Sequence, residues 1–133
     1  MRVPLGRQLG KRTIFVDGAM GTQLFERGVQ PGGCNEKLNL DRPEIVESVH
    51  RAYFEAGCDA VLTNTFGGNA ISLGRHGLAE RVRDINLAAA AIARKAAGED
   101  RYILGDIGPS GGFLEPLGSL TEDELLAAFT EQA

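Results

Sequence analysis

The sequence of 133 residues has few of the features that mark a membrane, secreted or nucleic-acid-binding protein. No hydrophobic run approaches the roughly 20 residues that are needed to cross a bilayer. The first residues carry positive charge but lack the apolar stretch of a secretory signal, so we expect a cytoplasmic protein. The net charge of −4 offers no basic surface to nucleic acid.

Cysteine is also scarce, and the common nucleotide-binding motifs are missing. Cys34 and Cys58 form no Cys-x-x-Cys pair and no cluster with histidine. Because a cytosolic chain of this size rarely carries a disulfide, we expect two free thiols. The spacings G-x-G-x-x-G and G-x-x-x-x-G-K-[ST] are absent from the places where they would bind phosphate, which disfavours nucleotide binding.

Glycine, in contrast, is abundant, and most of the 18 glycines follow strand-like runs. The hydrophobic fraction of 43% and the charged fraction of 24% are typical of a soluble globular domain. Three short runs are almost continuously apolar, which predicts buried parallel strands. These runs are Thr13–Val16, Ala60–Thr65 and Tyr102–Ile107.

The first of these runs is followed, after a long loop, by a helical pattern from Arg42 to Ala56. Apolar residues recur on one face of this pattern, and Gly57 is expected to end the helix. Asp41 and Glu44 have the spacing of an N-terminal capping box. His50 lies on this helix, far from the carboxyl ends of the strands, and we expect it to be partly exposed.

Two further helices are expected after the second and third runs. One extends from Glu80 to Ala97 and is ended by Gly98, and the other begins at a capping box formed by Thr121 and Glu124. The alternation of strand and helix predicts an α/β fold with a parallel sheet and right-handed crossovers. We expect the N-terminal part, three βα units, of a (β/α)8 TIM barrel, because the dinucleotide-binding spacing of a doubly wound sheet is absent.

The lengths of the connections predict which edge of the sheet carries a site. The links from helix to strand are tight, at Gly57–Asp59 and Gly98–Arg101, whereas those from strand to helix are long. Long loops gathered at the carboxyl ends of parallel strands are where such folds keep their sites. The long connections are Asp17–Asp41, Phe66–Ala79 and Gly108–Leu120.

Asp17 closes the first strand and is followed by small residues. Gly18, Ala19 and Gly21 allow a ligand to approach backbone N–H groups closely. An amino acid suits this place, because Asp17 can bind its ammonium group and the amides after Gly18 can bind its carboxylate. The alternative is a plain turn in which Asp17 caps the short helix that follows.

Polar residues also close the second and third strands. Asn64 and Thr65 either bond to neighbouring strands or point into the mouth of a pocket. Asp106 requires a donor or a cation nearby, because an unpaired buried charge is costly. It is therefore either a residue of the site or a brace beside it.

Four strings that occur in order give the sequence a resemblance to a known family. It resembles the homocysteine S-methyltransferases, and within them the N-terminal homocysteine-binding domain of the cobalamin-dependent methionine synthases. The likeness implies that residues 1–133 are a partial homocysteine-binding domain, truncated after the third βα unit. The strings are Val16–Thr22, Val49–Gly57, Leu62–Gly67 and Gly105–Gly111.

This resemblance implies a zinc-bearing (β/α)8 barrel that transfers a methyl group to the thiol of homocysteine and so forms methionine. A thiol with a pKa near 8.5 is mostly protonated at pH 7, and coordination to Zn²⁺ removes its proton. The methionine synthase type takes the methyl group from methylcobalamin, which methyltetrahydrofolate recharges on other domains. Betaine and S-methylmethionine are alternative donors, and a non-catalytic truncated fragment is an alternative of another class.

The resemblance also assigns residues to the site. It implies that the stretch after the first strand holds the amino-acid end of homocysteine, and that residues at the other strand ends line the same mouth. The first set is Asp17, Gly18 and Ala19, and the second is Asn64, Thr65 and Asp106. Homocysteine is the expected partner, together with cobalamin and folate domains of a parent protein.

The zinc ligands implied by the resemblance are three cysteines that have no counterpart in this chain. Cys34 and Cys58 are expected at opposite edges of the sheet, roughly 20 Å apart across a strand, and therefore cannot share a metal. We expect no metal ligand and no catalytic residue here, and no activity from the chain alone. Three of eight strands would leave unpaired edges and an uncovered inner face, which predicts self-association or loose packing.

Overall fold

A computed structural model describes residues 3–133, and its centre is a small parallel sheet. Strand β1 (Ala60–Leu62) pairs with strand β2 (Tyr102–Leu104), with Ala60 opposite Tyr102. Val16 forms a single parallel bridge to Ala60. The three predicted runs therefore lie side by side in the order in which they occur along the chain.

The strands are shorter than the sequence predicts. The run Thr13–Val16 makes only one bridge, and the N–H group of Phe15 donates to the carboxylate of Asp59 at 2.9 Å rather than to a strand. Beyond β1, Thr63 still donates to the carbonyl of Leu104, but the N–H group of Thr65 turns back to the carbonyl of Thr63. A hydrogen bond to a side chain in the first run, and a turn after β1, thus replace the strand pairing that the sequence predicts there.

Helices of very different lengths connect the strands. The described residues include no helix that is both long and apolar enough to cross a membrane. The α-helices are α1 (Leu5–Gln8), α2 (Gly21–Glu26), α3 (Leu38–Asp41), α4 (Pro43–Glu55), α5 (Ala70–Gly74), α6 (Val82–Ala97) and α7 (Glu122–Gln132), and the 3₁₀ helices are η1 (Asn35–Lys37) and η2 (Ala79–Arg81).

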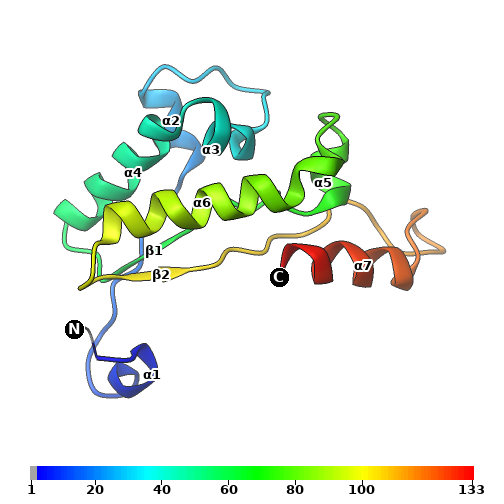
Figure 1. Ribbon diagram of the computed structural model, residues 1–133. Coiled ribbons are helices and arrows are strands. Elements are labelled where there is room, and N and C mark those ends of the chain that lie inside the picture. The colour runs from blue at the N-terminus through cyan, green and yellow to red at the C-terminus, as the bar shows by residue number, and fades with distance from the viewer. Residues whose placement is uncertain (1–2) are drawn as a thin grey trace.

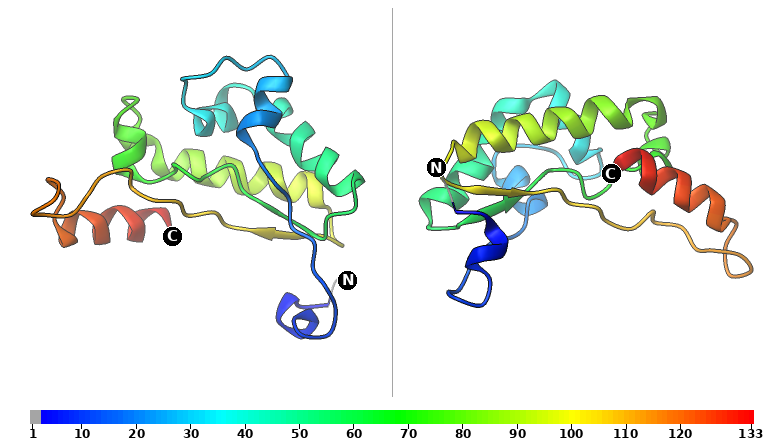
Figure 2. Two further views of the ribbon diagram at one scale, coloured as in Figure 1. Left: turned by 180° about the vertical axis from the view of Figure 1, so that it is seen from behind. Right: turned by 60° about the horizontal axis from the view of Figure 1, so that its bottom comes forward.

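Helices α4 and α6 pack against each other and cover one face of the sheet (Figure 1). The N-terminal segment with α1 lies on the opposite side, as the two views of Figure 2 also show. Val61 and Ile103 pack against Phe54, Ala93 and Ala97 of the covering helices. The α/β class with parallel strands is confirmed, whereas closure into a (β/α)8 barrel stays a prediction.

A hydrophobic core cluster, separate from the one beneath the strands, packs the helices of the first long loop against the helices that cover the sheet. It contains Leu24 of α2, three residues of α4 and Ile92 of α6, and Leu24 is completely buried. Each completely buried leucine or valine side chain contributes about 1.5–3 kcal/mol to stability. The long loop is therefore anchored by apolar burial as well as by hydrogen bonds.

One predicted helix cap is wrong. Asp41 does not cap α4, because it ends the preceding helix α3 and pairs with Lys37 at 3.1 Å. Arg42 separates the two helices with φ −144° and ψ 59°, and its side chain makes no capping hydrogen bond. Pro43 occupies the first turn of α4, where a missing N–H group costs nothing. The spacing of Asp41 and Glu44 fitted a capping box, but the chain turns one residue later.

The helix predicted from Glu80 begins at Val82, because Ala79–Arg81 form the 3₁₀ helix η2, whereas the predicted capping box and the two glycine stops are confirmed. Thr121 and Glu124 form a reciprocal capping box, with the Glu124 N–H group donating to Thr121 Oγ1 at 3.2 Å and the Thr121 N–H group donating to Glu124 Oε2 at 2.8 Å. Gly57 and Gly98 follow α4 and α6 with φ values of +106° and +58°. Glycine reaches these values without steric cost, so both helices stop there.

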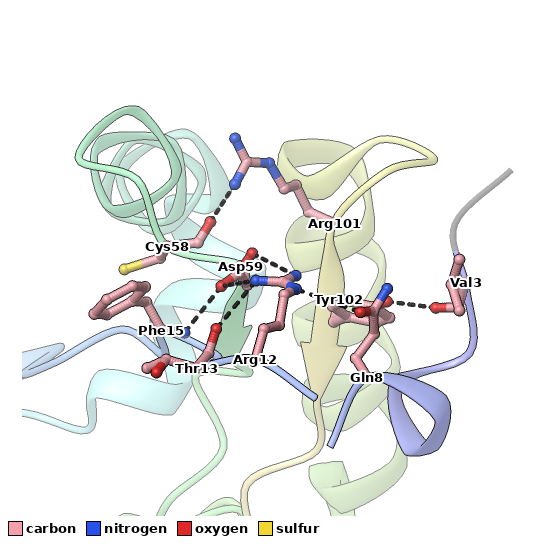
Figure 3. Close-up of polar contacts among 9 residues, drawn as sticks. All are labelled: Val3, Gln8, Arg12, Thr13, Phe15, Cys58, Asp59, Arg101 and Tyr102. Carbon is pink, nitrogen blue, oxygen red and sulfur yellow. Dashed lines mark hydrogen bonds and ion pairs between the residues drawn. The ribbon is translucent and has the colours of Figure 1, made fainter. Parts of the chain in front are cut away.

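The N-terminal segment is tied to the amino ends of the strands (Figure 3). Arg12 donates to both carboxylate oxygens of Asp59, at 3.0 and 2.9 Å, and Tyr102 Oη donates to the carbonyl of Val3. The hydrogen bonds from Arg12 and from the backbone of Phe15 lower the pKa of Asp59. The amino edge of the sheet is thus occupied by structural contacts, which leaves the carboxyl edge to form a site.

Several apolar side chains along the strands remain exposed. Phe15 is 62% exposed, Val16 is 41% exposed, and Ile107, the last residue of the third run, is 51% exposed. This agrees with the expectation that three strands leave apolar surface uncovered. Self-association of the isolated chain stays a prediction.

The expectation that His50 is partly exposed is wrong. Its side chain is completely buried in α4, and neither ring nitrogen has a hydrogen-bond partner among residues 3–133. Burial disfavours the charged imidazolium and lowers the pKa of His50 to about 4. The helical period explains the burial, because His50 lies one turn after Val46 and one turn before Phe54, which are both core residues.

Replacing His50 by leucine tests this assignment. A histidine whose folded-state pKa is depressed destabilises the fold as the pH falls from about 6.5 towards 4, because only the unfolded chain then binds a proton freely. We expect wild type to lose on the order of 2 kcal/mol in that interval, and His50→Leu to lose less while remaining at least as stable at pH 7. Urea denaturation at several pH values measures this, and parallel losses in both proteins would contradict it.

Candidate functional site

A cavity of about 350 Å³ lies at the carboxyl edge of the sheet. Five of the six predicted site residues line it, and only Thr65 does not. The cavity is enclosed by the end of the first strand, the first long loop, and the ends of β1 and β2. Its lining residues are Asp17, Gly18, Ala19, Met20, Gly21, Asn35, Glu36, Leu62, Thr63, Asn64, Phe66 and Asp106.

Asp17 is held in the cavity wall by the neighbouring strand. Its carboxylate accepts a hydrogen bond from the backbone N–H group of Leu62, at 3.1 and 3.2 Å to the two oxygens. Burial, with a smaller contribution from the charge of Asp106, raises the pKa of Asp17 to about 6, although backbone hydrogen bonds act in the opposite direction. The alternative that Asp17 caps the next helix is wrong, because Met20 is the N-cap of α2 and no side chain caps it.

The small residues after Asp17 lie against Tyr53 of α4. Tyr53 Oη donates to the carbonyl of Ala19 at 2.8 Å. A Cβ atom on Gly18 would lie 3.2 Å from Tyr53 Oη. A larger residue at position 18 would therefore push Tyr53 back by a few tenths of an ångström. The backbone N–H groups of Ala19 and Met20 have no acceptor among residues 3–133, and both residues line the cavity.

Asn64 braces the first long loop. Its side-chain amide donates to the carbonyl of Asn35 at 2.8 Å and to Asn39 Oδ1 at 3.1 Å. Asn39 in turn donates to the backbone carbonyl of Asn64 at 2.8 Å. Because Asn39 and Asn64 are both buried, this reciprocal pair fixes the loop where it meets the cavity.

Thr65 belongs to a closed ring of hydrogen bonds that joins the end of β1 to the segment after β2. Thr65 Oγ1 donates to the carbonyl of Asp106 at 2.7 Å, and the N–H group of Asp106 donates to Thr63 Oγ1 at 3.0 Å. The two threonine hydroxyls are 2.6 Å apart. Because the hydroxyl hydrogen of Thr65 is donated to the Asp106 carbonyl, the hydroxyl of Thr63 is the donor in the contact between the two threonines. Thr65 thus holds Asp106 in place rather than lining the cavity.

The side chain of Asp106 is half-buried in the cavity wall, and no hydrogen bond among residues 3–133 engages its carboxylate. Burial and the negative charge of Glu36 raise its pKa. Asp106 is therefore a carboxylate with its backbone fixed and its side chain available. Of the two alternatives drawn from the sequence, this arrangement favours a residue of the site over a brace.

Glu36 lines the cavity although it is not among the site residues predicted from the sequence. Its Oε1 atom accepts a hydrogen bond from the N–H group of Gly67 at 2.7 Å, and its Oε2 atom accepts one from the thiol of Cys34 at 3.4 Å. Glu36 thereby joins the first long loop to the second. The available signal was its position among polar residues inside a long loop on the carboxyl edge.

The electrostatic character of this cavity is acidic. Asp17, Glu36 and Asp106 all line it, and no basic side chain is among the described residues that do so. Met20, Leu62 and Phe66 add an apolar wall. Such a cavity suits a small molecule with a positively charged group and an apolar portion.

The described residues do not fit a zinc site. Within residues 3–133 there is no group of three or more histidine, cysteine, aspartate or glutamate side chains placed to hold a metal ion. Both cysteines are free thiols, as the sequence predicts. Cys34 lies in the first long loop beside Glu36, whereas Cys58 lies in the tight link before β1, at the amino edge of the sheet (Figure 3).

Replacing Asp17 by asparagine tests whether the buried negative charge of Asp17 destabilises the folded protein, because the substitution removes the charge and keeps the side-chain oxygen. A carboxyl group whose folded-state pKa is raised destabilises the fold as the pH rises from about 4 to about 6, and asparagine can still accept from Leu62. We expect Asp17→Asn to be more stable than wild type at pH 7, by about 1 kcal/mol after allowance for solvent screening. The difference should vanish below pH 4 in urea denaturation.

Asp59→Asn is the matched control, because the pKa of Asp59 is lowered and its loss should reduce stability at pH 7. A decrease of similar size in both variants would contradict the account of Asp17.

Comparisons with known proteins show the family of the chain. A family model described as homocysteine S-methyltransferase matches residues 14–133. Methionine synthases from Mycobacterium tuberculosis and Mycobacterium leprae are 45% and 43% identical over 139 residues, which cover 94% of this chain and 11% of each relative. The chain thus spans about a tenth of the length of the curated relatives it matches.

Two solved structures resemble the fold. Both are of the homocysteine methyltransferase MmuM from Escherichia coli. The metallated form has a TM-score of 0.70 and 27% identity, over 82% of this chain and 42% of that one. The oxidized form has a TM-score of 0.69 and 26% identity, over 79% and 41% of the two chains.

Proposed function

Because the chain belongs to the homocysteine S-methyltransferase family, we propose that it forms the part of a methyltransferase that holds the amino-acid end of homocysteine. The reaction is the transfer of a methyl group to the homocysteine thiol, which gives methionine. The observation that carries this proposal is one cavity that combines three carboxylates with unpaired backbone N–H groups.

The two kinds of group suit the two charges of an amino acid. Asp17 and Asp106 offer carboxylates to the ammonium group, and a charge-assisted hydrogen bond is about twice as strong as a neutral one. The N–H groups of Ala19 and Met20 are available to the substrate carboxylate. The apolar wall formed by Met20, Leu62 and Phe66 suits the methylene groups that lead to the thiol. Asn64 and Thr65 act indirectly in this proposal, by fixing the loops.

The zinc that the family resemblance implies has its ligands outside this chain in our proposal. The related structure is described as a metallated form of a homocysteine methyltransferase, which supports a metal in the whole enzyme. The described residues of this chain offer no ligand set, so we assign no step through the metal to them. Their contribution is to bind and orient the amino acid.

We propose the methionine synthase type, with methylcobalamin and methyltetrahydrofolate serving as donors on other domains of the whole protein. The methionine synthase relatives, at 43–45% identity, support this choice over an S-methylmethionine or betaine donor. The chain is then the N-terminal part of a (β/α)8 barrel in a cytoplasmic enzyme. The similarity to 42% of the solved methyltransferase chain supports that architecture.

Titration calorimetry with homocysteine tests the proposed function on this chain. We expect saturable binding that is weakened about tenfold or more in Asp17→Ala, because the ammonium group loses a charged partner. Asp100→Asn is the matched control, since Asp100 is exposed in the link before β2, at the other edge of the sheet. Absence of binding in wild type, or equal binding by wild type and Asp17→Ala, would overturn the proposal.

Zinc content measured on the same samples tests the location of the metal. We expect less than stoichiometric zinc on the chain, with or without homocysteine. One tightly bound zinc per chain would show that its ligands lie within these 133 residues.

A further inference from the structure

We propose that Glu36 is a specificity-determining residue that makes the cavity select ligands with a free ammonium group. This inference rests on the proposed function, because it assigns one further residue to the same amino-acid site. It adds a residue from the later part of the first long loop, in η1, to the residues that discriminate between ligands.

The position of Glu36 is fixed from two sides. Glu36 lies in the 3₁₀ helix η1, and its Oε1 atom accepts from the Gly67 N–H group at 2.7 Å. The neighbouring Asn35 is held through its carbonyl by Asn64 at 2.8 Å. A side chain held by its own hydrogen bond and by its backbone neighbour presents its charge at a defined place.

Gly67 is what permits this arrangement. A Cβ atom at position 67 would lie 2.9 Å from Glu36 Oε1, closer than real side chains approach. A larger residue there would displace the carboxylate. The contact between the first and second long loops thus depends on a glycine in one and a glutamate in the other.

No basic side chain among residues 3–133 lines the cavity and neutralises the charge of Glu36 there. Lys37, the adjacent residue, pairs with Asp41 at 3.1 Å and does not line the cavity. Glu36 and Asp106 line the same cavity, and after burial the negative charge of Glu36 is the second cause that raises the pKa of Asp106, as expected for two neighbouring carboxylates that repel each other. A ligand ammonium group relieves this repulsion, whereas a ligand without one leaves it in place.

The experiment compares two ligands that differ only in the amino group. Homocysteine carries it, and 4-mercaptobutanoate has the same carboxylate and thiol without it. Glu36→Gln keeps an oxygen that can accept from Gly67 and removes the charge. We expect this variant to bind homocysteine about tenfold more weakly than wild type, with little change for 4-mercaptobutanoate.

Discrimination between the two ligands is the decisive quantity, because a purely structural role for Glu36 would weaken both together. Glu80→Gln is the matched control, since Glu80 is exposed in η2 and does not line the cavity. Far-ultraviolet circular dichroism of Glu36→Gln should match that of wild type.

Two outcomes separate the inference from the proposed function. If wild type discriminates between the ligands and Glu36→Gln discriminates equally well, or loses both ligands equally, the role of Glu36 is refuted and the proposed function stands. If wild type itself does not prefer homocysteine, the proposed function fails.

Discussion

Parallel pairing of β1 with β2, extended by the bridge from Val16, is the constraint on which the site depends. Parallel strands end at the same edge, so residues that are far apart in the sequence meet there. Asp17, Asn64 and Asp106 follow three different strands and line one cavity for this reason. The opposite edge has only short links and is held by the Arg12–Asp59 ion pair.

The same geometry that assembles the site also stores unfavourable electrostatic energy in it. Burial raises the pKa values of Asp17 and Asp106, and a neighbouring negative charge adds to the effect in each case, that of Asp106 for Asp17 and that of Glu36 for Asp106. Hydrogen bonds from backbone N–H groups hold two of these carboxylates in place: Leu62 donates to Asp17, and Gly67 donates to Glu36. In the proposed function a cationic ligand offsets this cost on binding, which would link the instability of the empty cavity to its selectivity.

Much of this arrangement could be predicted from the sequence, because it follows from hydrophobic period and loop length. The helix faces, the order of the strands and the edge that carries Asp17 are confirmed. His50 was misjudged because polarity was given more weight than its place on the apolar helix face. Thr65 was predicted to line the mouth of the site but lies in a hydroxyl ring beside it, and Glu36 was not predicted, because a hydroxyl ring and a contact between two loops depend on which loops meet. Asp41 fitted a capping box, but the chain turned one residue later.

The central claim is that the three strand ends form one amino-acid site. Amide chemical shifts of the ¹⁵N-labelled chain, recorded as homocysteine is added, test it most directly. The account predicts that the largest saturable shifts fall on Gly18–Gly21, Glu36 and Asn64, and that Asp106, which borders both this cavity and the one beside it, shifts together with them. Largest shifts at Arg83–Ala90 and Glu131–Ala133, which border a second cavity of about 390 Å³ between α6 and α7, would contradict it.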